Sequence, residues 1–381
     1  MSRRLKPDRP ADNQMKLMPQ RANLAGRFVA LLLGCVVAAC SSIGPVTVPR
    51  DRVDYITAVA ESWKEQTLLN IVRMRYGDAP SFVDVSSIIG AYAVQGQLAA
   101  NAAISSNLTN NAPWNLVTLG GNATYLDRPT ITYTPITGDK FARSLLRPIP
   151  PSAVFELVQA GYPADAILQM TTRAINGIYN RSSRGISARE PDPEFYPLLD
   201  ALRRLQLSGA VSVRLDKRGP NEVSIVIFSD RRSPDVNRDL QYVEKTLGAT
   251  PGKDGELALT SGPLARSDKE IAVLTRSMAE ILLEVSAGIE VPSEDVTEGL
   301  TSPSTRLADA PNPHDRPLVR IISGATQPAS PFAAVHYGST WYWIAKNDLA
   351  SKRVFTFLMM FFSLAETGVT PATPVLTLPA N

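Results

Sequence analysis

The sequence YAVQGQLAANAAI, residues 92–104, alternates between two sets of positions. One set is mostly apolar and the other is mostly Ala, Gln and Asn, and VTLGGNATY at residues 117–125 alternates in the same way. A period of two residues is typical of a β-strand, where successive side chains point to opposite faces of a sheet. The segment 105–115 between them is rich in Asn, Ser and Thr and contains a Pro, which favours a loop. These stretches therefore predict two long strands that form a hairpin.

This hairpin carries no charge, because no Asp, Glu, Lys, Arg or His occurs between Asp84 and Asp127. Two interpretations stay open for residues 85–126. The hairpin is either a sheet covered by the rest of the protein or by another subunit, or a pair of strands inserted in a membrane, where about 9–11 residues suffice to span. Open strand edges are not tolerated in lipid, so insertion requires a ring of identical subunits. Such a homo-oligomeric pore resembles oligomeric lipoprotein export channels in architecture.

The N-terminus has the features of a secretory signal. Residues 1–27 hold seven basic and two acidic residues, and an uncharged stretch, Phe28–Ala39, then leads to Cys40. Twelve residues are too few to cross a bilayer as a helix, which takes about 20. Translation could begin at Met1, Met15 or Met18.

The residues Val37-Ala38-Ala39-Cys40 resemble the lipobox of bacterial lipoproteins. The resemblance implies a lipid on Cys40, which becomes the new N-terminus. Cys35 also fits the pattern, but cleavage there would leave an apolar run of only seven residues. Ser41 rather than Asp follows the cysteine, which implies sorting to the outer membrane of a Gram-negative host, with the folded part facing the periplasm; retention in the inner membrane is the alternative.

Removing this leader changes the charge of the chain. It holds seven of the 39 basic and two of the 36 acidic residues, so the remainder carries 32 against 34, a net charge of −2. The basic field that favours nucleic acid is therefore absent from the exported part, and we expect no nucleic-acid partner. Cys35 and Cys40 are the two cysteines of the chain, so no disulfide is expected in the fold.

The remaining patterns predict an α+β protein, because helices and antiparallel hairpins alternate without βαβ regularity. Expected helices cover Val53–Tyr76, Asp139–Leu146, Ser152–Ala160, Ala164–Tyr179, Phe195–Leu207, Asp235–Leu247, Asp268–Ala287 and Asp348–Glu366. Further expected strands cover Ala210–Leu215, Glu222–Phe228, Leu318–Ile322, Phe332–Tyr337, Trp341–Ala345 and Pro374–Leu378. The expected organisation is a signal peptide (1–39), a tether (40–52), a helix with the long hairpin (53–138), an α+β helical region (139–289), an exposed Pro/Ser-rich loop (290–317) and a C-terminal ββα(β) unit (318–381).

The sequence offers little catalytic chemistry. It has two histidines, His314 and His336, without ligand spacing, and no nucleophile or phosphate-binding motif. We therefore expect no catalytic residue, no metal and no cofactor. Trp341-Tyr342-Trp343 is the densest aromatic cluster and is either a surface that stacks on a sugar or peptide, or half core and half surface. His336 lies in an expected strand, and the simplest interpretation is that its role is structural. The acidic residues at 190–194 are most simply part of a solvated loop.

The part after the leader resembles an uncharacterised group of proteobacterial outer-membrane lipoproteins. The resemblance rests on the segments Leu69–Tyr76, Arg128–Pro135 and Pro374–Pro379, and it implies no activity. The sequence as a whole predicts a non-enzymatic, lipid-anchored envelope protein that binds or assembles with an envelope protein or with copies of itself. A homo-oligomeric export pore is the first alternative, and a periplasmic hydrolase or carbohydrate-binding protein is the second.

Overall fold

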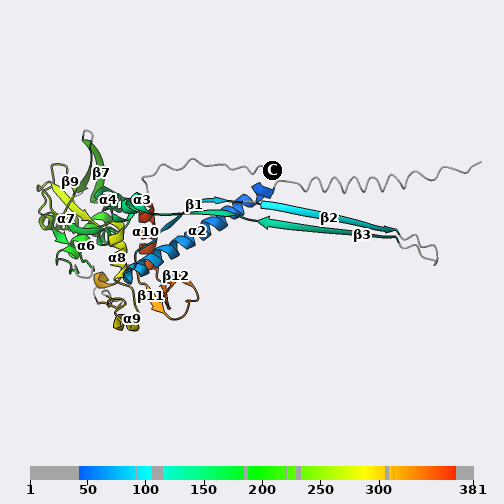
Figure 1. Cartoon of the computed structure of the whole chain (residues 1–381). Coiled ribbons are helices and arrows are strands. Elements are labelled where there is room, and N and C mark those ends of the chain that lie inside the picture. The colour runs from blue at the N-terminus through cyan, green and yellow to red at the C-terminus, as the bar shows by residue number, and fades with distance from the viewer. Residues whose placement is uncertain are drawn as a thin grey trace, which may run out of the picture. The chain divides into compact units, whose positions relative to one another are not determined.

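The computed structural model of the chain describes residues 43–90, 92–104, 115–183, 188–218, 221–228, 233–304, 309–311 and 313–365. Backbone contacts divide the chain into two units. The first comprises Met1–Ile56 and Ile89–Thr130, and the second comprises Thr57–Ile88 and Ile131–Asn381. Helices combine with mostly antiparallel sheets, so the protein has the expected α+β fold. Figure 1 labels the elements used below.

The first helix, α2 (Ile43–Arg75), begins ten residues before the expected start at Val53. Most of the segment expected as a tether, 40–52, is therefore helical. Pro45 falls in the first turn, where backbone N–H groups have no partner within the helix, so it costs no hydrogen bond there. Pro49 lies inside the helix and removes one N–H donor.

The expected hairpin is present in the first unit. Strands β2 (Tyr92–Ile104) and β3 (Asn115–Asp127) pair antiparallel without a register shift, from Tyr92 opposite Asp127 to Ile104 opposite Asn115 (Figure 1). Val94 stands opposite Tyr125 and Ala100 opposite Leu119, so the apolar positions of one strand face the apolar positions of the other across the ladder. Residues directly opposite each other share one face of a sheet. The alternation in both strands is therefore in phase.

Strands β1 (Val83–Ile89) and β4 (Thr130–Pro135) flank this hairpin in the sequence and pair with each other. Two buried residues lie at the ends of these strands that are away from the hairpin: Phe82 precedes β1 and Ile136 follows β4. The Ile136 N–H donates a hydrogen bond of 2.9 Å to the Phe82 carbonyl. After β4 the chain continues into the helices α3 (Gly138–Phe141) and η1 (Ala142–Leu146), which confirm the helix expected at Asp139–Leu146.

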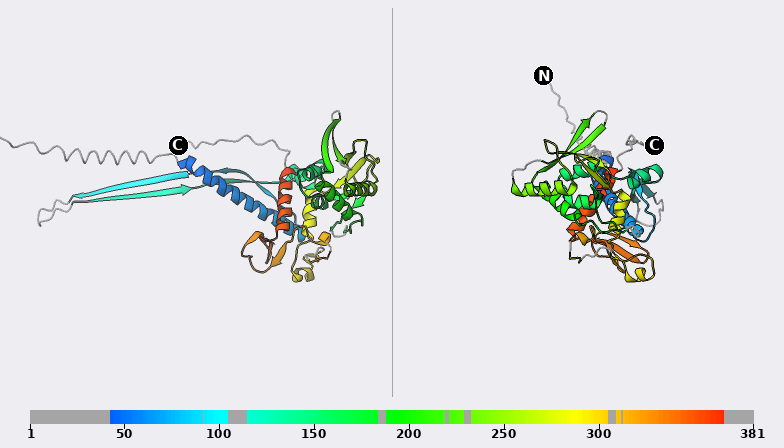
Figure 2. Two further views of the ribbon diagram at one scale, coloured as in Figure 1. Left: turned by 180° about the vertical axis from the view of Figure 1, so that it is seen from behind. Right: turned by 90° about the vertical axis from the view of Figure 1, so that its left-hand side faces the viewer.

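A mixed six-stranded sheet forms the centre of the second unit, in the order β6-β5-β10-β9-β8-β7. The strands are β5 (Thr172–Ile175), β6 (Ile178–Tyr179), β7 (Val211–Arg218), β8 (Asn221–Phe228), β9 (Glu256–Ser261) and β10 (Glu270–Thr275). Only β9 and β10 pair in parallel. Four helices accompany the sheet (Figure 2). They are α4 (Pro151–Gln159), which contacts the sheet, and α5 (Ala164–Thr171), α6 (Phe195–Leu207) and α7 (Pro234–Leu247), which contact one another in sequence; α6 also contacts β7.

Two expected helices are wrong in part. The segment Ala164–Tyr179 is helical only as far as Thr171, and Asn176-Gly177 then turns the chain between β5 and β6, with φ of 45° and 82°. Two consecutive left-handed residues form the tight turn that Asn-Gly favours. The segment Asp268–Ala287 is β10 followed by α8 (Met278–Ser286). A capping box at Ser277 and Glu280 begins α8.

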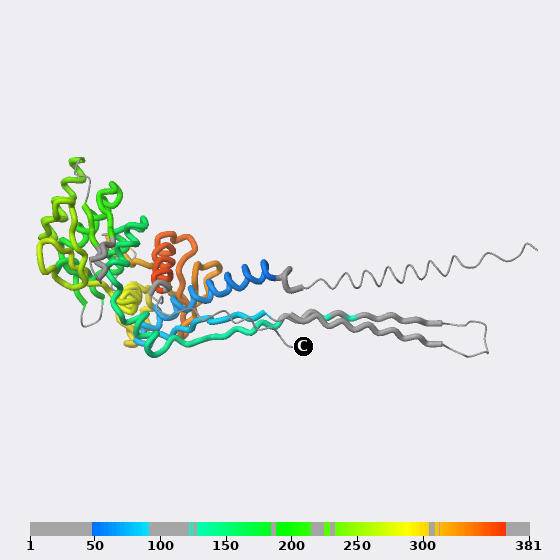
Figure 3. The backbone as a smooth tube through the Cα atoms, turned by 90° about the horizontal axis from the view of Figure 1, so that it is seen from above, coloured from blue at the N-terminus to red at the C-terminus, as the bar shows by residue number. Residues whose placement is uncertain are grey.

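The C-terminal region is close to expectation. Strands β11 (Ile322–Gly324), β12 (Pro331–Tyr337) and β13 (Thr340–Ala345) form a sheet in the order β11-β13-β12, and α10 (Leu349–Ala365) follows. Phe332 of β12 meets Phe355 of α10 edge-on at 6.1 Å between ring centres, and Figure 3 shows the helix beside these strands. The first strand differs from the expectation, because β11 shares only Ile322 with the expected strand Leu318–Ile322. The strand expected at Pro374–Leu378 lies outside the described residues.

The segment expected as an exposed loop, 290–317, contains the helix α9 (Ser293–Thr297) and a 3-10 turn, η3 (Pro313–Asp315). The described residues of this segment are exposed or half-buried. Ser304 donates a hydrogen bond to the Ile289 carbonyl, and Tyr76, the residue after α2, donates one to the carboxylate of Asp295. The segment is therefore partly helical and hydrogen-bonded to its neighbours, which its composition does not show.

Candidate functional site

The aromatic cluster Trp341-Tyr342-Trp343 lies on β13, and the strand divides it between two faces. Tyr342 is completely buried, whereas Trp341 and Trp343 are half-buried on the opposite face. Trp343 covers Gly324 of β11, where a Cβ atom would come within 3.0 Å of its ring. The expected aromatic surface therefore consists of Trp341 and Trp343, and Tyr342 does not belong to it. Stacking of a sugar or peptide on these two rings stays a prediction.

Tyr342 instead belongs to a partly buried polar network. Its hydroxyl lies 2.5 Å from the hydroxyl of Tyr76, which donates a short hydrogen bond to the carboxylate of Asp295. Arg75 donates to the carbonyls of Ala287 and Ser302, at 3.4 and 2.6 Å. Burial raises the pKa of both Tyr76 and Tyr342 above its ordinary value, so both hydroxyls stay protonated. The network therefore fastens residues 287–302 to the end of α2.

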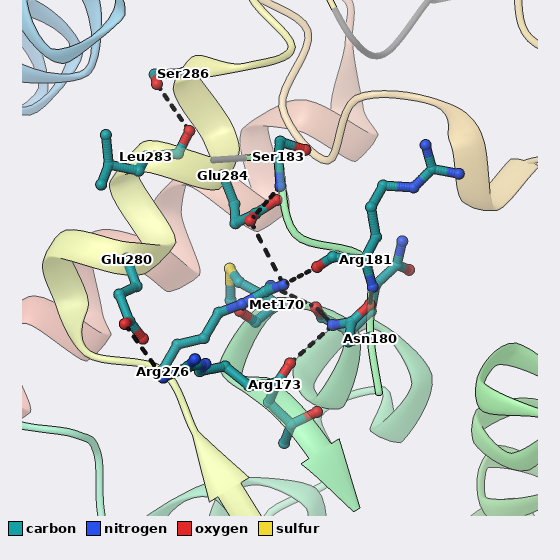
Figure 4. Close-up of polar contacts among 12 residues, drawn as sticks. Met170, Arg173, Asn180, Arg181, Ser183, Arg276, Glu280, Leu283, Glu284 and Ser286 are labelled. Atoms are coloured by element: carbon teal, nitrogen blue, oxygen red, sulfur yellow. Dashed lines mark hydrogen bonds and ion pairs between the residues drawn. The ribbon is translucent and has the colours of Figure 1, made fainter. Parts of the chain in front are cut away.

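A second buried network surrounds Arg276, which follows β10 directly (Figure 4). Its side chain is 3% exposed, and the guanidinium donates to the carbonyls of Gln169, Met170 and Arg181. The first two carbonyls belong to the last turn of α5, where a cation is favourable. Glu284 of α8 is 2% exposed, lies 3.7 Å from the guanidinium and accepts the N–H of Ser183 at 2.8 Å. Arg276 therefore joins the end of α5, the chain after β6 and α8.

A cavity of about 250 Å³ opens beside this network and is lined by three further arginines, Arg173, Arg181 and Arg189. Four arginines at one cavity suggest an anion site. Each of the three, however, forms an ion pair of its own: Arg173 with Glu280 at 3.7 Å, Arg181 with Glu190 at 3.0 Å and also with Asp315, and Arg189 with Asp192 at 2.6 Å. With Glu284 included, the acids outnumber the arginines. Among the residues that the structure describes around this cavity, carboxylates therefore balance the arginines.

The two histidines lie in different parts of the second unit. His314 of η3 stacks on Tyr196 of α6, with ring centres 4.3 Å apart and planes within 7°, and its Nε2 lies 3.8 Å from Asp200. His336 of β12 is exposed, 5.1 Å from the ring of Trp341. Among the residues that the structure describes, no three His, Cys, Asp or Glu side chains converge to hold a metal ion. The predicted absence of catalysis, metal and cofactor stays a prediction.

Neither buried network was found from the sequence, although one signal was present. Three charged residues, Arg276, Glu280 and Glu284, interrupt a mostly apolar stretch, IAVLTRSMAEILLEV, residues 271–285. Charges inside a buried segment must be paired. The partners of the Tyr76 network come from three distant segments, and no sequence pattern connects them.

Cys40 and the hairpin loop, 105–114, lie outside the described residues. Within the described part of the chain, no helix has both the length and the apolar character needed to cross a membrane. The chain matches no protein-family model, no curated protein and no solved structure.

Proposed function

We propose that this chain is a lipid-anchored, non-enzymatic assembly protein of the bacterial envelope, in which the hairpin β2–β3 pairs with hairpins of other copies. The observation that carries the proposal is a sheet of only two strands, each of 13 residues, in a sequence without charge from Val85 to Leu126. An isolated two-stranded hairpin is at best marginally stable in water. Further strands beside it would supply the missing stability.

The edges of the hairpin support this proposal. Among the described residues, neither β2 nor β3 has a second strand partner. Edge strands of monomeric proteins are usually protected by Lys, Pro or a bulge, because their free N–H and C=O groups can pair with another chain. Here neither strand contains Lys or Pro, and their pairing has no register shift. These edges are suited to pairing with further copies.

The dimensions of the hairpin favour a more specific candidate, a pore in the outer membrane. Thirteen residues at about 3.3 Å each extend about 43 Å. Inclined at about 45°, such a strand spans about 30 Å, the thickness of the hydrocarbon layer. The matched register adds a second argument, since one face is apolar and the other carries Gln, Asn and Thr. A ring of hairpins would direct the first face to lipid and the second to the lumen.

The test is to extract the full chain from membranes in detergent and measure its native mass. A pore predicts a stable homo-oligomer that stays in the membrane when Cys40 is changed to Ala. A monomer that leaves the membrane in the Cys40→Ala variant would overturn the proposal of hairpin assembly. A soluble oligomer released by Cys40→Ala would support assembly and exclude the pore.

Two matched variants test the role of each face. Leu119→Lys places a charge opposite Ala100 on the apolar face, where a lysine at mid-membrane costs about 2–4 kcal/mol. Gln97→Lys places the same charge opposite Asn122, which is exposed. The pore predicts loss of the oligomer in the first variant and retention in the second. Equal effects of both would contradict it.

A further inference from the structure

A groove of about 510 Å³ lies between α5 and α10, and its walls are almost entirely apolar. One wall comes from the start of α5 and the residues before it, including Tyr162 and Ile167. The other comes from α10, between Leu349 and Met360. This length of helix measures about 16 Å. The size falls within the range of about 300–1,000 Å³ that small-molecule sites occupy.

The groove leaves apolar side chains of α10 in contact with solvent. Leu349 is 54% and Met360 is 47% exposed, while Phe355 and Phe362, elsewhere on the same helix, are buried in the core. A helix that packs on one side normally carries polar residues on the other. Tyr162 crosses the groove to α10, with its ring 5.2 Å from Phe357 and its hydroxyl 3.9 Å from the Met360 sulfur, which is a weak acceptor. Methionine adapts its shape to varied apolar ligands.

The charges at the groove have one sign. Lys352 and Arg353 line it, and none of its described lining residues is acidic. Lys352 donates to the carbonyl of Lys346 at 3.1 Å and lies 5.6 Å from the centre of the Phe332 ring, and it forms no ion pair with any carboxylate that the structure describes. Arg353 is exposed and forms no ion pair with any residue that the structure describes. Unlike the arginines beside Arg276, these two cations are therefore not neutralised by carboxylates in the described part of the chain.

We propose that this groove binds a single-chain anionic amphiphile, a long-chain alkyl carboxylate. Its alkyl chain would lie along α10 towards Phe357 and Met360, and its carboxylate would meet Arg353 and Lys352. Apolar walls bind the chain by removing it from water, and an arginine binds a carboxylate through two parallel hydrogen bonds. The proposal depends on neither the hairpin nor the lipid anchor.

The test is calorimetric titration of the full chain with octanoate, decanoate and dodecanoate, each below its micelle concentration. Affinity should rise about fourfold for each added methylene as long as the chain fits the groove. Dodecyltrimethylammonium, which has the same chain and the opposite charge, should bind at least tenfold more weakly than dodecanoate. Absence of saturable binding, or equal binding of the two dodecyl compounds, would overturn the proposal.

Variants locate the site. Met360→Glu should reduce dodecanoate affinity at least tenfold, and Arg353→Glu should remove the preference for dodecanoate over the ammonium compound. Both side chains are exposed, so neither change should unfold the protein. Arg238→Glu on α7, an exposed arginine away from the groove, is the matched control and should leave affinity unchanged.

Two other occupants of the groove give different results. If residues 366–381 of this chain fill it, deleting them should raise dodecanoate affinity at least tenfold. If a second copy covers it, Met360→Glu should convert an oligomer to a smaller species at constant dodecanoate affinity. Either result would replace the proposed ligand.

Discussion

Replacing Arg276 by methionine should be among the most destabilising single changes in this protein. Methionine retains the length of the side chain but removes the guanidinium, which donates to three backbone carbonyls and faces Glu284. Glu284, a carboxylate that is 2% exposed, would then lose the guanidinium that lies 3.7 Å from it. Removing one partner of a buried ion pair costs about 3–5 kcal/mol, because the other charge stays buried. We expect Arg276→Met to lower the free energy of unfolding by about 4 kcal/mol.

The assay is equilibrium unfolding in urea, followed by circular dichroism. With a slope of about 3 kcal/mol per molar urea, the midpoint should fall by roughly 1.3 M. Glu284→Gln should cost less, about 2 kcal/mol, since the amide oxygen can still accept from Ser183 and Arg276 keeps its carbonyls. Arg204→Met is the control. Arg204 is 56% exposed and pairs with Asp239, so its loss should cost less than about 1 kcal/mol.

The reasoning would be refuted by a small effect at Arg276. If Arg276→Met costs less than about 1 kcal/mol, or no more than Arg204→Met, the buried network does not join α5 to α8. A midpoint that falls equally for Arg276→Met and Glu284→Gln would show that the carbonyl contacts contribute nothing beyond the ion pair.

Three further predictions concern single positions. A hydrogen bond to Asp78, together with burial, raises the pKa of Tyr337 from 10.0 to about 12. The folded state therefore holds this proton more tightly than the unfolded state, so the stability that it contributes is complete below pH 10 and is lost as the pH rises to about 12. The difference in unfolding free energy between wild type and Tyr337→Phe should shrink over that interval. Gly255 has a φ of +77°, and a Cβ atom there would meet the Phe228 carbonyl oxygen at 2.0 Å, so Gly255→Ala should lower the melting temperature strongly. Gly248→Ala is the control, because φ is +62° there but the space is open, and its cost is about 1–2 kcal/mol. Equal melting temperatures of the two variants would contradict this prediction. Asn176 has a φ of 45°, and its side chain forms hydrogen bonds with the backbones of Leu247 and Ala272. Asn176→Ala should therefore destabilise the protein more than Asn176→Gly, because both variants lose these bonds but only glycine adopts the positive φ without strain. Urea midpoints in the reverse order would count against this explanation.

Elements with strong periodicity and clear ends were predictable from the sequence. The helix Phe195–Leu207 has the expected limits, and the hairpins β2–β3, β7–β8 and β12–β13 occur where alternation placed them. Errors arose where two signals compete. Ser267 and Ser277 are each followed by Glu after three residues, which is the capping-box pattern, but only Ser277 caps a helix. The apolar run between them suits a strand or a buried helix equally, and pairing with β9 and β5 decides for the strand.

The candidate sites were less predictable than the fold. One of the two interpretations of the aromatic cluster, half core and half surface, correctly placed Tyr342 on the opposite face from Trp341 and Trp343. It follows from the alternation of consecutive residues between the two faces of a strand. The ion pairs that neutralise the arginines near Arg276 involve partners up to 134 residues away in the sequence. The groove between α5 and α10 likewise depends on how two distant helices meet. Such features follow from tertiary packing and have no local pattern.

The pairing of β1 with β4 gives the long hairpin the character of an insertion. The chain leaves the second unit along β1 and returns along β4, and paired strands lie about 4.8 Å apart. A two-residue turn could close that distance, so residues 90–129 could be excised and the host fold preserved. By the same geometry, residues can be added or removed in pairs along β2 and β3 without disturbing β1, β4 or the helices that follow. The length of this hairpin can therefore change, by natural or engineered insertions and deletions, independently of the rest of the protein.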